Sequence, residues 1–96
     1  MEVLLLPQVL DELHDATQFY DNQNPEAAAA FIVETDRVFE LLAENPYLGT
    51  PTRRGARRCT MDRFPYKIFY RVEPERIVVV AVAHHRRRPW YWLKRL

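Results

Sequence analysis

Hydrophobic side chains at the start of the chain form one short unbroken run and then a stripe of helical period. Val3 to Leu6 are all apolar and Pro7 closes the run, which predicts a short strand over Met1–Leu6. Pro7 suits the first position of a helix, and we expect that helix to end near Asn22–Asn24. Its apolar stripe is Val9, Leu13, Ala16 and Tyr20. Its acidic residues fall outside the stripe and are expected to face solvent: Asp11, Glu12, Asp15 and Asp21.

A second helix is predicted directly after the first. Asn24 is a good N-cap, Pro25 suits the first helical position, and Glu26 lies near the positive end of the helix dipole. The helix should run to about Asn45, because Pro46 cannot continue it. Its buried face is predicted from the recurrence of Phe31, Thr35, Val38 and Leu42. The two helices should therefore form an antiparallel hairpin.

The pattern changes to strands after a turn-rich segment at 45–51, which holds two prolines and a glycine. Residues 57–62 read as an edge strand, and residues 66–72 alternate as a half-buried strand does. Residues 77–83 are apolar throughout and mostly β-branched, which predicts a central strand covered on both faces. The tail from His84 onward is basic and aromatic.

These elements predict a single α+β domain over residues 1–96. It should contain an N-terminal strand and the helical hairpin, packed on a mainly antiparallel sheet of about four strands. The other face of the sheet is expected to be free. Lys67 and Arg71 should point to that face, with Arg57 or Arg58 added from the neighbouring strand. Tyr66 and Tyr70 should face the core.

Charge divides the chain into two parts of opposite sign. Residues 1–52 hold ten carboxylates and one arginine, a net charge of −9, whereas residues 53–96 hold thirteen basic residues and three acidic ones, a net charge of +10. One interpretation is that the second part binds nucleic acid or an acidic protein segment. The other is that the two parts neutralise each other across their packing.

Several classes of protein are excluded or disfavoured. No apolar run approaches the roughly 20 residues of a membrane span, so we expect a cytoplasmic protein without membrane contact. Cys59 is the only cysteine and makes neither a disulfide nor a redox pair. His84 and His85 are adjacent on a strand and should point to opposite faces, with no further ligand set. We therefore expect no metal and no cofactor.

Three stretches of the sequence carry a resemblance to a known family. They are Asn-Pro-Tyr-Leu-Gly at 45–49, Phe-Pro-Tyr-Lys-Ile-Phe-Tyr-Arg-Val at 64–72, and Ala-Val-Ala-His-His-Arg-Arg-Arg-Pro at 81–89. In this order, after a strand and two helices, they closely resemble the RelE/ParE superfamily of bacterial toxins over nearly the whole chain. The resemblance implies the growth-inhibiting toxin of a type II toxin–antitoxin or plasmid stabilization system. It also implies a cognate antitoxin that wraps an extended segment around the toxin, giving a hetero-oligomer.

The resemblance leaves two mechanisms open. ParE-like toxins act on DNA gyrase, whereas RelE-like toxins cleave messenger RNA at the ribosome without a metal. The sequence lacks several lysines grouped with a positioned acid–base residue, which favours a ParE-like binding inhibitor over an enzyme. A third hypothesis, supported only by the basic second part, is a nucleic-acid-binding module with no toxic role.

Candidate site residues follow from these mechanisms. For a ribonuclease, the resemblance places phosphate-binding cations at Lys67 and within Arg86–Arg88, and a C-terminal histidine or tyrosine as proton-transfer group. The catalytic candidates are Lys67, His84, His85, Arg87 and Tyr91. The candidates for binding a target or the antitoxin are Arg57, Arg58, Arg71, Arg86, Arg88, Trp90 and Trp92. The alternative is that the tail aromatics pack over the helices as a lid on the core and that the arginines are merely solvated.

Overall fold

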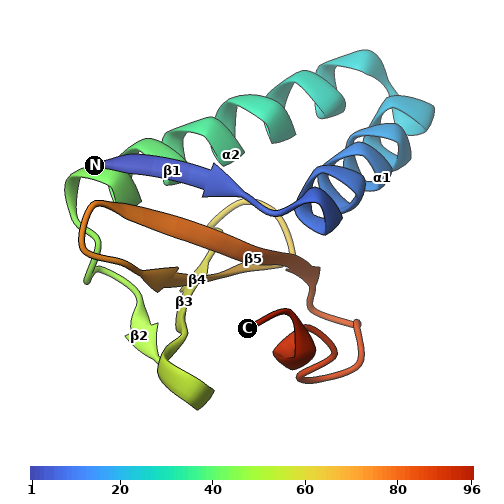
Figure 1. The fold of residues 1–96 in the computed structure, drawn as a ribbon. Coiled ribbons are helices and arrows are strands. Elements are labelled where there is room, and N and C mark those ends of the chain that lie inside the picture. Colours follow the sequence, from blue (N-terminus) through green and yellow to red (C-terminus); the bar gives the residue numbers. More distant parts are fainter.

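A computed structural model describes the whole chain, residues 1–96, as two helices on one face of a five-stranded sheet (Figure 1). The helices are α1 (Pro7–Gln23) and α2 (Pro25–Glu44). The strands are β1 (Glu2–Leu5), β2 (Thr50–Pro51), β3 (Arg57–Thr60), β4 (Tyr66–Val72) and β5 (Arg76–His84), and two 3-10 turns are η1 (Arg53–Gly55) and η2 (Leu93–Arg95). The predicted α+β class, with its N-terminal strand and helical hairpin, is confirmed.

Both helices begin where the sequence places a proline. Pro7 and Pro25 occupy first-turn positions, and the Asn24 side-chain oxygen accepts a hydrogen bond from the Ala27 amide at 2.7 Å. The predicted apolar stripes face the sheet and are buried at Val9, Ala16, Tyr20, Phe31, Thr35, Val38 and Leu42. Neither helix combines the length and the hydropathy that crossing a membrane needs.

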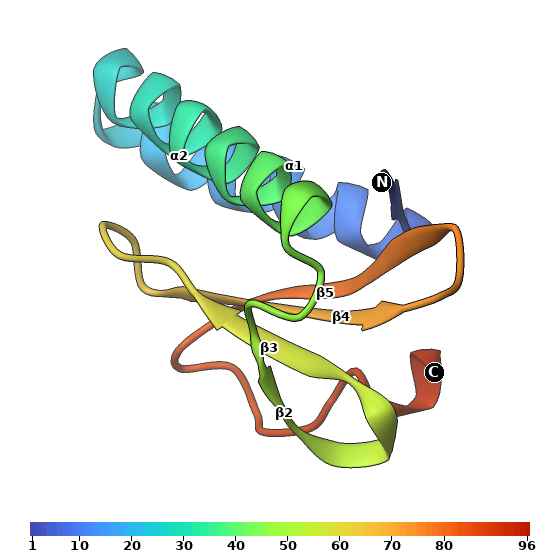
Figure 2. The same cartoon turned by 90° about the vertical axis from the view of Figure 1, so that its left-hand side faces the viewer.

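The sheet has the strand order β1-β5-β4-β3-β2 (Figure 2). Strand β1 runs parallel to β5, and every other neighbouring pair is antiparallel. The strand beyond the predicted four is β2, where Thr50 and Pro51 pair with β3 inside the segment expected to be irregular. Proline is tolerated there because an edge strand needs no further backbone donor. Strand β3 ends at Thr60 rather than Asp62, because the chain turns and the Met61 amide donates to the Tyr66 carbonyl.

A β-bulge between β4 and β5 decides which side chains reach the face away from the helices. Phe69 pairs with Ala81 and Tyr70 pairs with Val79, so Val80 has no partner on β4. As a result Val80 and Ala81 both belong to the core on that far face. The bulge enlarges the apolar area that this face must cover.

Apolar side chains fill both faces of the sheet. The core under the helices contains Tyr66 and Tyr70, as predicted, and β5 is covered on both faces, as predicted. The expectation of a free far face is wrong, because residues 85–96, here called the tail, fold back across it (Figures 1 and 2). Phe69 and the outward residues of β5 would otherwise expose apolar surface to water, and Trp92 covers them.

The hydroxyl of Tyr70 ties the link between α2 and β2 to the sheet. It accepts a hydrogen bond from the Gly49 amide at 2.9 Å and donates to the Pro46 carbonyl at 2.7 Å. A Cβ at Gly49 would lie 2.7 Å from the Tyr70 hydroxyl and 2.8 Å from the Arg58 carbonyl oxygen. Only glycine allows this close approach.

Gly49→Ala is therefore expected to lower the free energy of unfolding by about 2–4 kcal/mol, because the methyl group displaces Tyr70 and both hydrogen bonds are lost. Urea unfolding followed by circular dichroism measures the change. Gly55→Ala is the matched control, since no atom lies within 4 Å of a Cβ there, and its positive φ alone should cost about 1 kcal/mol. Equal losses in the two variants would show that the contact with Tyr70 is no constraint.

Candidate functional site

A pocket of about 120 Å³ opens on the far face of the sheet, where the start of β4 and the end of β5 meet the tail. Six basic residues line it: Arg58, Lys67, His84, His85, Arg87 and Arg88. Aromatic residues complete its wall, namely Phe69, Trp90, Tyr91 and Trp92. We call this cavity the basic pocket.

Strand register brings the cations of β3 and β4 to this pocket. Lys67 lies opposite Ala83, and Arg58 lies opposite Phe69, so all four side chains share the far face. The first residue of the tail is held just before β4, where the His85 amide donates to the Pro65 carbonyl at 2.8 Å. The predicted alternation of β4 therefore delivers Lys67 correctly, and Arg58 rather than Arg57 joins it.

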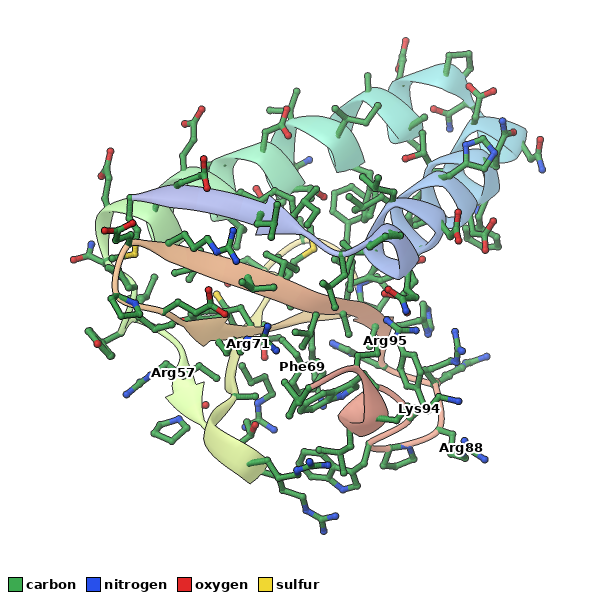
Figure 3. The ribbon with its side chains drawn as sticks, viewed as in Figure 1. Arg57, Phe69, Arg71, Arg88, Lys94 and Arg95 are labelled. Atoms are coloured by element: carbon green, nitrogen blue, oxygen red, sulfur yellow. The ribbon has the colours of Figure 1, made fainter.

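The basic residues of the pocket are not neutralised by the acidic part of the chain. Arg58, Lys67, Arg87 and Arg88 form no ion pair. The only carboxylate of residues 1–52 that is paired with a base of residues 53–96 is Glu12, which binds Arg95. Figure 3 shows three basic residues of the tail, Arg88, Lys94 and Arg95, on the side of the sheet away from the helices. The far face of the sheet therefore carries arginine and lysine side chains that no carboxylate pairs.

Three of the predicted binding residues lie outside the pocket lining. Arg57 donates to the Gly49 carbonyl at 2.7 Å and so braces the link before β2. Arg71 forms an ion pair with Glu73 at 3.0 Å. Arg86 is exposed, and its backbone amide donates a hydrogen bond to His84 Nδ1. Of the arginines predicted to bind a partner, Arg58 and Arg88 therefore line the pocket, and the other three lie outside it.

The two tail tryptophans have different environments. Trp92 is 1% exposed, and its ring centroid lies 4.4 Å from that of Phe69. Its side chain belongs to the core and lines the basic pocket from within. Trp92 therefore acts as a lid, but this lid covers the sheet and not the helices. Trp90 is half-buried with the Arg53 guanidinium 4.3 Å from its ring centroid. Trp90 is therefore the tail tryptophan within reach of a partner.

The candidate proton-transfer groups are not arranged as an acid–base pair. The Tyr91 hydroxyl donates to the Glu12 carboxylate, and burial together with this bond raises the pKa of Tyr91 above its ordinary value. The Nδ1 of His84 accepts a hydrogen bond from the Arg86 amide at 3.0 Å. His85 is exposed, and neither histidine has a carboxylate partner. The pocket is therefore better suited to holding an anion than to moving a proton.

Sequence reasoning missed Glu12, which was expected on a solvated face. Its side chain is 11% exposed and accepts hydrogen bonds from Val82, Tyr91 and Arg95. These partners lie 70 or more positions away in the sequence. No local pattern around Glu12 signals them, because the contact exists only when the tail folds back.

A second surface lies on the opposite side of the molecule. An apolar groove of about 160 Å³ is formed where α1 and α2 meet the end of β1. Its lining includes Leu5, Leu13, Phe31, Ile32 and Phe39. Along the same hairpin Leu10, Ile32 and Val33 are all exposed. This concentration of uncovered apolar side chains is typical of a protein–protein contact.

Comparison with known proteins agrees with this fold. A family model described as "ParE toxin of type II toxin-antitoxin system, parDE" matches residues 3–89. A solved structure described as "Chromosomal ParDE TA system from P. aeruginosa" superposes with a TM-score of 0.77 at 20% sequence identity, over 88% of this chain and 95% of that chain. At this identity the likeness establishes the fold alone. A search of curated proteins gave no match.

Proposed function

Because the chain belongs to the ParE toxin family of type II toxin–antitoxin systems, we propose that it arrests bacterial growth by binding DNA gyrase through its basic pocket and tail. The observation that carries this proposal is the group of unpaired cations around the pocket, beside the half-buried Trp90. Arginine and tryptophan are the residues that most often dominate a binding interface. Gyrase and an antitoxin would both be met in the cytoplasm.

A second candidate function is cleavage of messenger RNA at the ribosome. It is favoured by one observation, the presence of Lys67, His85 and Arg87 around a single pocket. Such a reaction needs a base for the 2′-hydroxyl, cations for the phosphate and an acid for the leaving oxygen. The cations are present, but Tyr91 is bonded to Glu12 and unsuited to donate a proton to substrate. Binding to gyrase therefore has the stronger support.

Inducible expression in bacteria separates the two functions. We expect growth arrest with intact transcripts and a DNA-damage response within the first generation. Growth arrest with transcripts cut inside coding regions would instead identify the ribonuclease. Normal growth during accumulation of folded protein, with no antitoxin present, would contradict both, and salt-sensitive nucleic-acid binding would then support a module without toxicity.

The antitoxin is proposed to use two surfaces of the toxin. The groove between α1 and α2 offers exposed apolar side chains, which suit the apolar face of an amphipathic segment. The basic pocket suits an acidic segment of the same partner, because its cations have no internal counter-charge. Occupation of the pocket by this acidic segment would block access of the target. The resulting complex would be a toxin–antitoxin hetero-oligomer.

Ile32→Glu is expected to weaken antitoxin binding by about 10- to 100-fold, because it places a charge in the apolar groove. Toxicity should persist, since Ile32 is remote from the basic pocket. Co-expression with the antitoxin measures the effect: the wild type is neutralised and the variant still arrests growth. Ile32→Leu is the control and should be neutralised. Full neutralisation of Ile32→Glu would exclude the groove as an antitoxin site.

A further inference from the structure

Glu12 of α1 is the one carboxylate of the helical layer that holds the tail. Its Oε1 accepts hydrogen bonds from the Val82 amide at 3.0 Å and from Arg95 Nη1 at 3.2 Å, while its Oε2 accepts the Tyr91 hydroxyl. Glu12 and Arg95 are each 11% exposed. A single side chain thus joins α1, β5 and the tail. Burying a carboxylate costs free energy, and this set of hydrogen-bond donors compensates that cost.

The same contacts close an open edge of the sheet. Strand β1 pairs with β5 only as far as Val79, so beyond that residue β5 has a strand only on its β4 side. Glu12 accepts the Val82 amide there, and Arg95 Nη1 donates to the Val80 carbonyl at 3.0 Å. The ion pair of Glu12 and Arg95 therefore satisfies backbone groups that a further strand would otherwise bind. Loss of either partner would leave the edge uncapped.

Contacts of Tyr91 extend the arrangement to the basic pocket. The guanidinium of Arg87 lies 3.9 Å from the Tyr91 ring centroid, and that of Arg95 lies 5.0 Å from it. Arg87 is part of the pocket lining, whereas Arg95 is not. The position of Arg87 consequently depends on the ring of Tyr91, which is fixed by its hydroxyl bond to Glu12.

We infer that Glu12 is a positioning residue, which fixes the tail on β5 and thereby sets the arrangement of the cations in the basic pocket. The effect of Glu12 on toxicity rests on the proposed function, whereas its effect on the tail does not. Glu12 is itself negatively charged, so it would not bind an anionic surface of the target directly. Its effect on target binding comes through the cations whose positions it fixes. The expected consequence is a variant that is folded, has a loosened tail and inhibits gyrase weakly.

Glu12→Gln tests this inference in the full-length protein. Glutamine keeps the size and an oxygen for Val82, but it removes the charge that binds Arg95. Hydrogen exchange of the tail amides should become at least about tenfold faster, while exchange in β4 stays unchanged. A general loss of stability would speed exchange in both. The inhibitory concentration against gyrase supercoiling should rise by about tenfold.

Asp11→Asn is the matched control, because it removes one charge from the neighbouring exposed position of α1. Its tail exchange and its inhibition should equal those of the wild type. The double variant Glu12→Gln/Arg95→Gln should be no worse than the more affected of the two single variants if both act through one contact. Additive effects of the two changes would overturn the shared contact.

Two results would overturn the inference. The first is unchanged tail exchange in Glu12→Gln, which would show that the tail is held without this charge. The second is faster tail exchange with undiminished inhibition, which would separate the tail from the binding surface. If the wild type itself fails to inhibit gyrase, the proposed function fails, and the exchange comparison still decides whether Glu12 positions the tail.

Discussion

Replacing Arg58, Lys67 and Arg88 together with glutamine should abolish growth arrest and leave the fold intact. None of the three side chains forms an ion pair, so their loss breaks no internal contact of this kind. If each cation contributes about 1.4 kcal/mol to target binding, affinity falls about tenfold per residue and about a thousandfold in all. Growth after induction, with the protein level measured in parallel, reports the effect.

Arg63→Gln is the control for this triple variant, because Arg63 is not part of the basic pocket. Its charge instead helps to lower the pKa of Glu34 on α2. It should remain toxic. The single variants also distinguish the two mechanisms. A binding surface weakens gradually as each arginine is removed, whereas an enzyme loses activity by orders of magnitude at one residue. A complete loss at His85→Ala alone would contradict the binding inhibitor.

Trp92→Ala should cause the largest loss of stability of any single change considered. The side chain is 1% exposed and covers Phe69 and the far side of β5, so truncation leaves a cavity in the second core. We expect a loss of about 3–5 kcal/mol, which lowers the Tm by more than about 12 °C in a domain of this size. Thermal unfolding followed by far-ultraviolet circular dichroism measures it.

Tyr47→Ala removes an aromatic ring that is 68% exposed and serves as the comparison. Its cost should stay near 0.5–1 kcal/mol, mainly from the contact of its ring with Arg57. A loss below about 1 kcal/mol in Trp92→Ala would show that the tail is not part of the core. That result would also remove the basis for a pocket built between tail and sheet.

The local sequence pattern was sufficient to predict the two helices and the core between them and the sheet. Proline marks the start of both helices, Asn24 caps the second, and the spacing of Phe31, Val38 and Leu42 identifies the buried face of α2. Alternation in β4 gives the direction of Tyr66 and Lys67 correctly. These features depend on neighbours within a few residues, which is why the sequence reveals them.

The far face was not predictable in the same way. Nothing near Trp92 indicates that it packs on Phe69 rather than facing a partner, because that contact joins residues from separate parts of the chain. The partners of Glu12 are equally distant. One signal was present, since β5 is apolar at consecutive positions and therefore needs cover on both faces. With the helices on one side, the tail was the segment left to cover the other.

The most direct test of a toxin that binds gyrase is to add the purified chain to gyrase and, in parallel, to translating ribosomes with messenger RNA. We expect inhibition of supercoiling that weakens in the Arg58/Lys67/Arg88 variant, together with intact messenger RNA. Cleavage of the messenger RNA on the ribosome with no effect on gyrase would contradict it, and would transfer the role of the basic pocket from target binding to catalysis.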